Sequence, residues 1–239
     1  MNKIGICVVG WYYFSKFYKQ LEGSEFEVFV VAHRYNKILD KHKLKYFVKD
    51  NVGVEYGAYN YYINNIWKKG YDVFFMHDDI DCLKFNDVIS SNYKILKKKN
   101  INHASIVNGR HMSYTERFFY MSSKFTQIMV EEYGGVWYDK ENLGYTSRKA
   151  QPSHWHPRRY NLGGLEFKKR SIDIEKKYKI KIRFTLRDER VTLYHRGKKK
   201  IKGTYNSKEK EQQRLSGNRQ KKQRKREEKI FNIKHKKGQ

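Results

Sequence analysis

Three carboxylates, Asp78, Asp79 and Asp81, follow directly on the apolar run at residues 71–76. A short apolar run with no alternation is typical of a strand buried on both faces, and open α/β sheets bind ligands beyond the carboxyl ends of such strands. Carboxylates packed this closely repel one another unless a cation neutralises them, and hard oxygen ligands suit Mg²⁺ or Mn²⁺ carrying phosphate oxygens. The sequence therefore places the chemistry where this strand ends.

The elements before this strand predict an α/β fold. Apolar runs at residues 3–10, 26–33 and 45–48 indicate strands, and a helix is expected at 16–21 between the first two. Strand, helix, strand is the beginning of a parallel sheet. The expected architecture is a Rossmann-like, mostly parallel sheet.

A glycine-containing turn and a helix precede the acidic strand. Asn51 and Gly53 suit a tight turn, and Gly57 and Ala58 are small residues where a helix begins against a ligand or a neighbouring backbone. Apolar side chains spaced by three and four residues continue this helix towards Gly70. The order of turn, helix and acidic strand end is more informative than any one of its parts.

This arrangement resembles the nucleotide-binding half of the GT-A glycosyltransferases, above all family 2. The resemblance covers about residues 3–110 and rests on Asn51-x-Gly53, on Ala58-x-Asn60, and on the apolar strand that closes in His77-Asp78-Asp79. This last triplet occupies the position of the family's Asp-x-Asp motif, with His77 in place of the first aspartate. The alternative frame, Asp79-Ile80-Asp81, matches the literal motif two residues later.

The resemblance implies a nucleotide-sugar donor and a divalent cation, Mn²⁺ or Mg²⁺, on its diphosphate. Asp79 is then the expected metal ligand, with His77 and Asp81 as further candidates. The expected donor-binding residues are Asp50, Asn51, Gly53, Ala58, Asn60 and Asp78. The chain departs from the family at the end of the first strand, which reads Gly10-Trp11-Tyr12-Tyr13, and after the second strand, where His33-Arg34 replaces an acidic residue.

An inverting transferase needs a carboxylate, or occasionally a histidine, to take the proton of the acceptor hydroxyl. Asp139 is the first candidate, and Glu132 and Glu166 are the next. Glu131 and Glu141 are further candidates. His154 and His156 could ligate a metal or stack a sugar, but without cysteine partners nearby, structural packing is the favoured explanation for them.

The rest of the chain is expected to form an acceptor-binding half and a tail. We predict a helix at 86–99, a strand at 104–107, a helix at 115–133 that ends at Gly134-Gly135, and a hairpin between strands 180–186 and 191–194. Residues 136–165 show little periodicity. The predicted division is residues 1–110 for the nucleotide-sugar, 111–200 for the acceptor and 201–239 as a disordered polybasic tail.

Charge is the strongest bulk signal. The 239 residues carry a formal charge of +27, and residues 196–239 hold 18 basic and four acidic residues, which is +14. Such a segment attracts polyanions, so nucleic acid or an anionic membrane surface are the partners it predicts, unless it serves only solubility. Cys7 and Cys82 are too few for a disulfide framework. Without a signal or spanning segment, the expected location is the cytoplasm, or the host cytoplasm if the source is viral.

The resulting prediction is a metal-dependent glycosyltransferase whose acceptor is polyanionic, either a modified DNA base of a virus or an envelope or lipid-linked glycan. Two alternatives stay open. The chain could be a nucleic-acid-binding protein with a non-catalytic domain of this kind, or a nucleotidyltransferase that uses the same metal chemistry.

Overall fold

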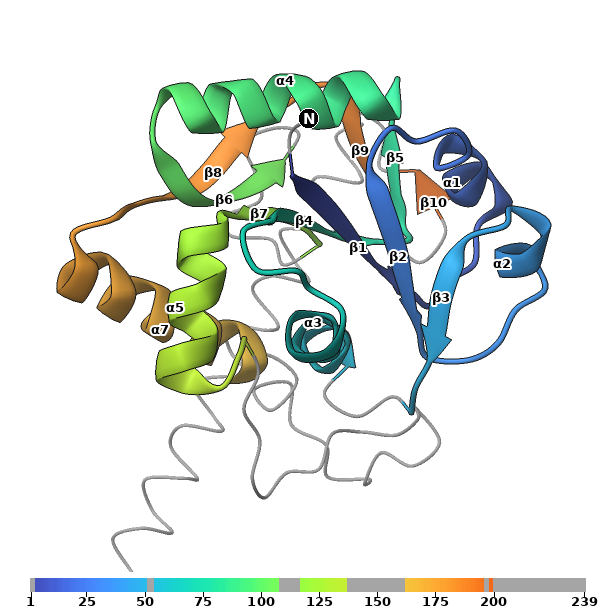
Figure 1. Ribbon diagram of the computed structural model, residues 1–239. Helices are drawn as coiled ribbons and strands as arrows, with labels where there is room; N and C mark the ends of the chain where they lie inside the picture. The colour runs from blue at the N-terminus through green and yellow to red at the C-terminus, as the bar shows by residue number, and fades with distance from the viewer. Residues whose placement is uncertain (1–2, 51–53, 108–116, 137–161, 196–197, 200–239) are drawn as a thin grey trace, which may run out of the picture. The chain divides into compact units, whose positions relative to one another are not determined.

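The computed structural model describes residues 3–50, 54–107, 117–136, 162–195 and 198–199, and everything below concerns these residues (Figure 1). The chain divides after Lys200 into residues 1–200 and 201–239. The second part, which contains most of the polybasic segment, lies outside the described residues. In the first part, strands from both predicted halves belong to one large sheet.

Ten strands and six helices are described in this part of the chain. The strands are β1 Ile4–Gly10, β2 Glu27–Ala32, β3 Lys45–Val48, β4 Asp72–His77, β5 Ile80–Cys82, β6 Ile101–Val107, β7 Phe118–Met121, β8 Lys181–Arg187, β9 Val191–His195 and β10 Lys198–Lys199. The helices are α1 Ser15–Gln20, α2 Ile38–Lys41, α3 Val54–Asn65, α4 Phe85–Lys98, α5 Ser123–Tyr133 and α7 Leu162–Tyr178.

The large sheet has seven strands in the order β3-β2-β1-β4-β7-β6-β8. Strands β1 to β4 are parallel, β6 and β8 are parallel to each other, and β7 is antiparallel to both β4 and β6. The predicted α/β fold with a mostly parallel sheet is therefore confirmed. The central strands β1 and β4 are buried almost throughout, as their unbroken apolar runs require.

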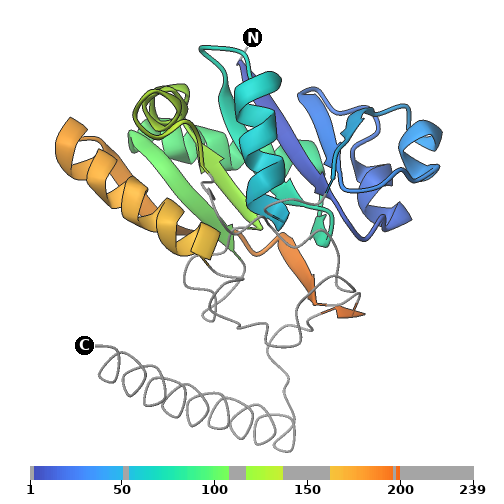
Figure 2. The same ribbon diagram turned by 90° about the horizontal axis from the view of Figure 1, so that it is seen from below.

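Helices cover both faces of this sheet, so the apolar side chains form two cores. Helices α1, α2 and α4 pack on one face, and α3, α5 and α7 pack on the other (Figures 1 and 2). The second core is rich in aromatic rings. Phe75 of β4 stacks on Phe119 of β7 with ring centroids 4.7 Å apart, and Tyr59 of α3 meets both rings edge-on. These contacts hold α3 against β4 and β7.

The expected helix at 115–133 is partly wrong, because residues 118–121 form β7 instead. The run Phe118–Met121 is buried at every position and inserts between β4 and β6, where it completes the sheet. The helix starts only at Ser123, and Ser122 caps it by accepting a hydrogen bond from the Phe125 backbone N–H. It ends at Gly134 in the left-handed region, as predicted.

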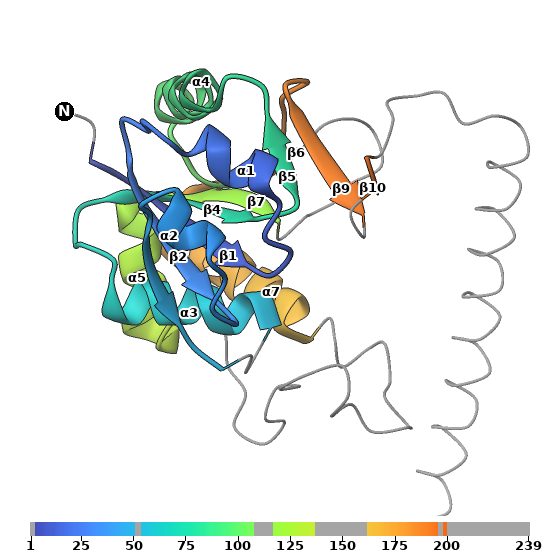
Figure 3. The same ribbon diagram turned by 90° about the vertical axis from the view of Figure 1, so that its right-hand side faces the viewer.

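The expected hairpin is also wrong, although both of its strands exist. Strand β8 pairs with β6 in the large sheet, whereas β9 pairs with β5 in a small second sheet, β10-β9-β5 (Figure 3). The turn between them is held to α4, because the Asp188 carboxylate accepts hydrogen bonds from Arg190 and from Asn92. This anchor directs β9 away from β8 and towards the strand that follows the acidic cluster.

Candidate functional site

The strand order identifies the carboxyl ends of the central strands as a candidate ligand site. From β1 the chain goes outward through β2 and β3, and it then returns to place β4 on the other side of β1. A reversal of this kind opens a crevice between the carboxyl ends of the two central strands, and open α/β sheets bind their ligands there. In this chain the two ends are Gly10 of β1 and His77 of β4, so the acidic cluster lies at the reversal.

Asp78 organises the loop that follows β1. Its Oδ2 accepts hydrogen bonds from the backbone N–H groups of Trp11, Tyr12 and Tyr13 at 2.9, 2.8 and 2.7 Å, and from the Tyr18 hydroxyl at 3.1 Å. Burial raises the pKa of the Asp78 carboxyl, against the lowering effects of His77 and of the three N–H groups. The carboxylate predicted to contact the donor thus holds one wall of the crevice in place.

Asp79 is fully buried and lies between two basic side chains. Its Oδ2 accepts a short hydrogen bond from the Arg117 guanidinium, and its Oδ1 lies 3.3 Å from His77 Nδ1. Burial lowers the pKa of His77, but Asp79 and Asp78 raise it more, so the net shift is upward. Arg117 was missed in the sequence, because it lies 38 residues away from Asp79 and comes next to it only through the insertion of β7.

Among the described residues, two carboxylate oxygens and one ring nitrogen at this point have no hydrogen-bond partner. Asp78 Oδ1, Asp79 Oδ1 and His77 Nδ1 are buried, and the nitrogen lies 3.7 and 3.3 Å from the two oxygens. Within the described residues no group of three or more His, Cys, Asp or Glu side chains could hold a metal by itself. The set therefore fits a hard cation only as part of a shell completed by phosphate oxygens and water, which is how Mg²⁺ is usually held.

Asp81, the third predicted metal ligand, belongs to a different contact. It lies on β5, and its Oδ2 forms an ion pair with Lys16 Nζ of α1 at 2.6 Å. This lysine is largely exposed, so the pair lies near the surface. The structure groups His77, Asp78 and Asp79 and leaves Asp81 outside that group.

Aromatic and basic side chains surround the ends of β1 and β2. The Trp11 and His33 rings meet edge-on at 5.7 Å, and the Tyr12 ring lies 5.7 Å from the His77 ring. The Arg34 guanidinium lies over the Trp11 ring and donates to the Trp11 carbonyl oxygen at 3.0 Å. Such flat surfaces can stack a nucleobase. The sequence alone marks these residues only as departures from the family pattern.

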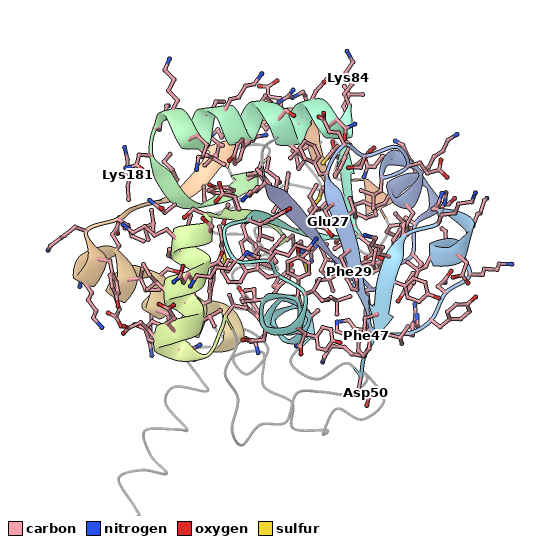
Figure 4. All side chains as sticks on the ribbon, in the orientation of Figure 1. Glu27, Phe29, Phe47, Asp50, Lys84 and Lys181 are labelled. Carbon is pink, nitrogen blue, oxygen red and sulfur yellow. The ribbon has the colours of Figure 1, made fainter. Side chains whose placement is uncertain are left out.

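The predicted donor-binding residues do not form one cluster. Asp50 is exposed at the end of β3 (Figure 4), whereas the Ala58 side chain is fully buried in the aromatic core. Asn60 faces the end of α5, since a Cβ at Gly135 would lie 1.9 Å from its Oδ1. Asn51 and Gly53 lie outside the described residues.

The predicted catalytic carboxylates have different environments. Glu132 of α5 is exposed and forms an ion pair with Lys177 of α7 at 2.6 Å. This pair lies close to the start of β8, at the opposite end of the strands from Asp79. Glu166 belongs to α7, a helix that the sequence pattern did not predict, and its side chain lies outside the described residues. Asp139, Glu141, His154 and His156 also lie outside them.

A hollow of about 560 Å³ lies at the opposite end of the strands from the acidic cluster. It is lined by parts of residues 21–28 and 41–45, at the starting ends of β2 and β3. It therefore does not involve the acidic cluster. Among the described residues, no helix is both long and apolar enough to cross a membrane.

Comparisons with known proteins give only distant likenesses. No protein-family model and no curated protein matches the chain. Among solved structures, TarS residues 1–349 of S. aureus is 14% identical, with a TM-score of 0.42 over 63% of this chain and 53% of that one, so this chain spans about half of it. A cytidylyltransferase of Leptospira borgpetersenii is 12% identical, with a TM-score of 0.43 over 79% and 77%. A CMP:2-keto-3-deoxy-manno-octonic acid synthetase in complex with CTP is 8% identical, with a TM-score of 0.43 over 78% and 90%.

Proposed function

We propose that this protein is a glycosyltransferase that moves a sugar from a nucleotide-sugar donor to an acceptor hydroxyl. One observation supports the proposal most directly: the buried carboxylates of Asp78 and Asp79 lie at the reversal between β1 and β4, and each has an oxygen with no hydrogen-bond partner in the part of the chain that the structure describes. An open α/β sheet binds nucleotides at such a reversal. The motif Asn51-x-Gly53, Ala58-x-Asn60 and His77-Asp78-Asp79, which resembles the family 2 glycosyltransferases, supports a sugar nucleotide as the ligand.

Asp79 would hold a divalent cation, Mn²⁺ or Mg²⁺, with His77 beside it. When bound, such an ion supplies positive charge to a leaving diphosphate, which is electrostatic stabilisation of the transition state. Asp78 serves the same site indirectly, because it fixes the backbone of Trp11, Tyr12 and Tyr13. This loop, with Arg34, would form the surface against the nucleobase.

The acceptor side of the reaction is proposed from charge. Residues 196–239 carry a net charge of +14. A polyanionic acceptor, either DNA with a modified base or an envelope or lipid-linked glycan, is consistent with that charge. Asp139 is the first candidate for the base that takes the acceptor proton, because Glu132 is engaged by Lys177.

Thermal stabilisation by a panel of nucleotide-sugars tests the proposal. A ligand that binds only the native state raises its melting temperature, so one sugar nucleotide should do so in the presence of Mn²⁺ and less in EDTA. Asp79→Asn should abolish the Mn²⁺-dependent part of the shift. Asp173→Asn, an exposed carboxylate of α7, is the matched control and should behave like the wild type.

The chemistry of the product separates the alternatives. A glycosyltransferase releases a nucleoside diphosphate or monophosphate from a sugar nucleotide, whereas a nucleotidyltransferase releases pyrophosphate from a nucleoside triphosphate. Formation of pyrophosphate, with no turnover of any sugar nucleotide, would reject glycosyl transfer. DNA binding that is unchanged or tighter in Asp79→Asn, with no nucleotide binding at all, would favour the nucleic-acid-binding alternative.

A further inference from the structure

The hollow at the starting ends of β2 and β3 has the size of a ligand site. Its volume of about 560 Å³ lies within the range of about 300–1,000 Å³ that is usual for small-molecule sites. Its walls are the chain from the end of α1 into β2 and the chain from the end of α2 into β3. Because the proposed donor site lies at the carboxyl ends of the strands, the hollow is separate from it.

One part of the lining is apolar. Phe26, Val28 and Leu44 line the hollow, and all three are half-buried where they pack on the core beneath α1, α2 and α4. Leu21, which also lines it, is buried. An apolar group in the hollow would remove the remaining exposed surface of these side chains from water, which is favourable. The wall therefore suits a ligand with an apolar body.

Another part of the lining is basic. Lys41, Lys43 and Lys45 alternate along the chain from the end of α2 into β3, and all three are exposed. Lys45 lies 3.8 Å from Oε1 of Glu27 at the start of β2 (Figure 4), and Lys68 lies closer to the same oxygen, at 2.8 Å. Glu27 is therefore already engaged by two lysines. Its charge does not balance that of Lys41 and Lys43, so an anion suits this part of the hollow.

Between these two lysines, His42 contributes a buried ring to the lining. Its side chain is only 4% exposed, and its Nδ1 lies 2.6 Å from Glu22 Oε1. Since a carboxylate accepts hydrogen bonds, Nδ1 donates to it and Nε2 is left for another partner. Nε2 is buried, and among the described residues it has no hydrogen-bond partner. Buried polar atoms are usually satisfied by protein, water or a bound ion, so a polar group at this ring is expected.

We propose that the hollow binds a small phosphate monoester with an apolar body, and that the phosphate lies against Lys41 and Lys43 while the body lies on the apolar wall. A phosphate monoester suits His42 Nε2 in either protonation state of the ring, because its monoanion carries an O–H donor and its dianion carries only acceptors. A carboxylate ligand offers acceptors alone. The site goes beyond the proposed function, since it uses none of the residues assigned to the donor.

An NMR titration of the full chain with hexyl phosphate tests the inference. The ring resonances of His42, identified by their absence in His42→Gln, should shift as the probe binds. The double variant Lys41→Gln/Lys43→Gln should bind about tenfold more weakly, because it loses two positive charges at the phosphate. Lys94→Gln/Lys98→Gln, which removes two exposed lysines of α4 outside the hollow, is the matched control and should bind like the wild type.

Three further probes test which part of the ligand is recognised. Hexanol lacks the anion and inorganic phosphate lacks the apolar body, so each should bind about tenfold more weakly than hexyl phosphate, or less tightly still. Hexanoate should bind more tightly than hexanol and more weakly than hexyl phosphate.

Unshifted His42 resonances at saturating hexyl phosphate would overturn the inference, and so would equal affinities of the wild type and the double lysine variant in the hollow. Equal binding of hexanol would show an apolar hollow without anion recognition, and tighter binding of hexanoate would reject the phosphate. Binding to vesicles that contain phosphatidic acid, without binding of hexyl phosphate, would replace the small molecule by a membrane surface. If His42→Gln does not fold, the affinities of the two double lysine variants decide.

Discussion

Loss of Arg117 should destabilise the fold much more than loss of Asp79, although the two residues form one ion pair. Arg117→Gln leaves a fully buried carboxylate without its guanidinium, and loss of one member of a buried pair costs about 3–5 kcal/mol. Because Arg117 is partly exposed, the expected cost lies at the lower end, about 3 kcal/mol. Asp79→Asn instead removes the buried charge and leaves a cation that water can reach, which is expected to cost about 1 kcal/mol.

A double-mutant cycle in urea measures both costs and their coupling. The double variant should cost about 1–2 kcal/mol, so that the coupling between the two residues is about 2–3 kcal/mol. For a unit of this size, 3 kcal/mol corresponds to a decrease in melting temperature of about 6–12 °C. The urea m-values should stay unchanged if the variants alter stability alone.

The difference in cost between Arg117→Gln and Asp79→Asn is the result that can refute this reasoning. If Asp79→Asn costs as much as Arg117→Gln, or more, then the buried carboxylate is neutralised by some other group. In that case the charge balance described here for His77, Asp79 and Arg117 is wrong.

Three further predictions concern the framework around the site. Gly135→Ala should lower the free energy of unfolding in urea by about 3 kcal/mol, because a Cβ at Gly135 would clash with Asn60 and the backbone has a φ of +128°. Gly134→Ala should cost only about 1 kcal/mol, because Gly134 has a φ of +70° and open space around it. Equal costs would contradict the close approach of Asn60 to Gly135. Burial lowers the pKa of His103 to about 4, below its value of about 6.5 in the unfolded chain. The unfolded state therefore binds an extra proton between these values, and the stability of the fold should decrease as the pH falls from about 6.5 to about 4. In urea titrations at several pH values, His103→Leu should reduce this pH dependence of stability, and an unchanged slope would exclude His103 as its cause. Burial raises the pKa of Asp188, but hydrogen bonds from Arg190 and Asn92 lower it more, so the net shift is downward. The Asp188 carboxylate therefore stabilises the fold above the unfolded pKa of about 4, and this stabilisation is lost as the pH falls below that value. Asp188→Asn should remove this acid dependence of stability, and an unchanged acid dependence would show that another group causes it.

The sequence predicted the central strands well because burial on both faces produces an unmistakable pattern. The buried runs of β1 and β4 appear where they were expected, and Asp78 and Asp79 do follow a central strand. The half-buried β2 and the mostly exposed edge strand β3 were also predicted correctly, from their apolar composition. Local spacing was sufficient there, since the strand and the carboxylates are adjacent in the chain.

The errors occurred where pairing between distant segments decides the structure. Residues 118–121 could extend a helix as well as form a strand, and only the gap between β4 and β6 selects the strand. The turn at Asp188 looked like that of a hairpin, but its hydrogen bond from Asn92 of α4 separates the two strands.

The candidate site shows the same limit. A motif can suggest a cation-binding role for Asp79, which stays a prediction, but it cannot show that Arg117 contacts Asp79 from the start of another strand. Likewise, the role of Asp78 in holding residues 11–13 depends on how β1 and β4 pair in register. The position of these carboxylates at the end of a strand could be predicted from one segment, whereas contacts between distant segments could not.

A crystal structure of the full chain with the best-binding nucleoside diphosphate and Mn²⁺ tests the central claim most directly. The account predicts the diphosphate beyond the ends of β1 and β4, with the ion on Asp79. A nucleotide found instead in the hollow lined by residues 21–28 and 41–45, with the Asp79 carboxylate untouched, would contradict it.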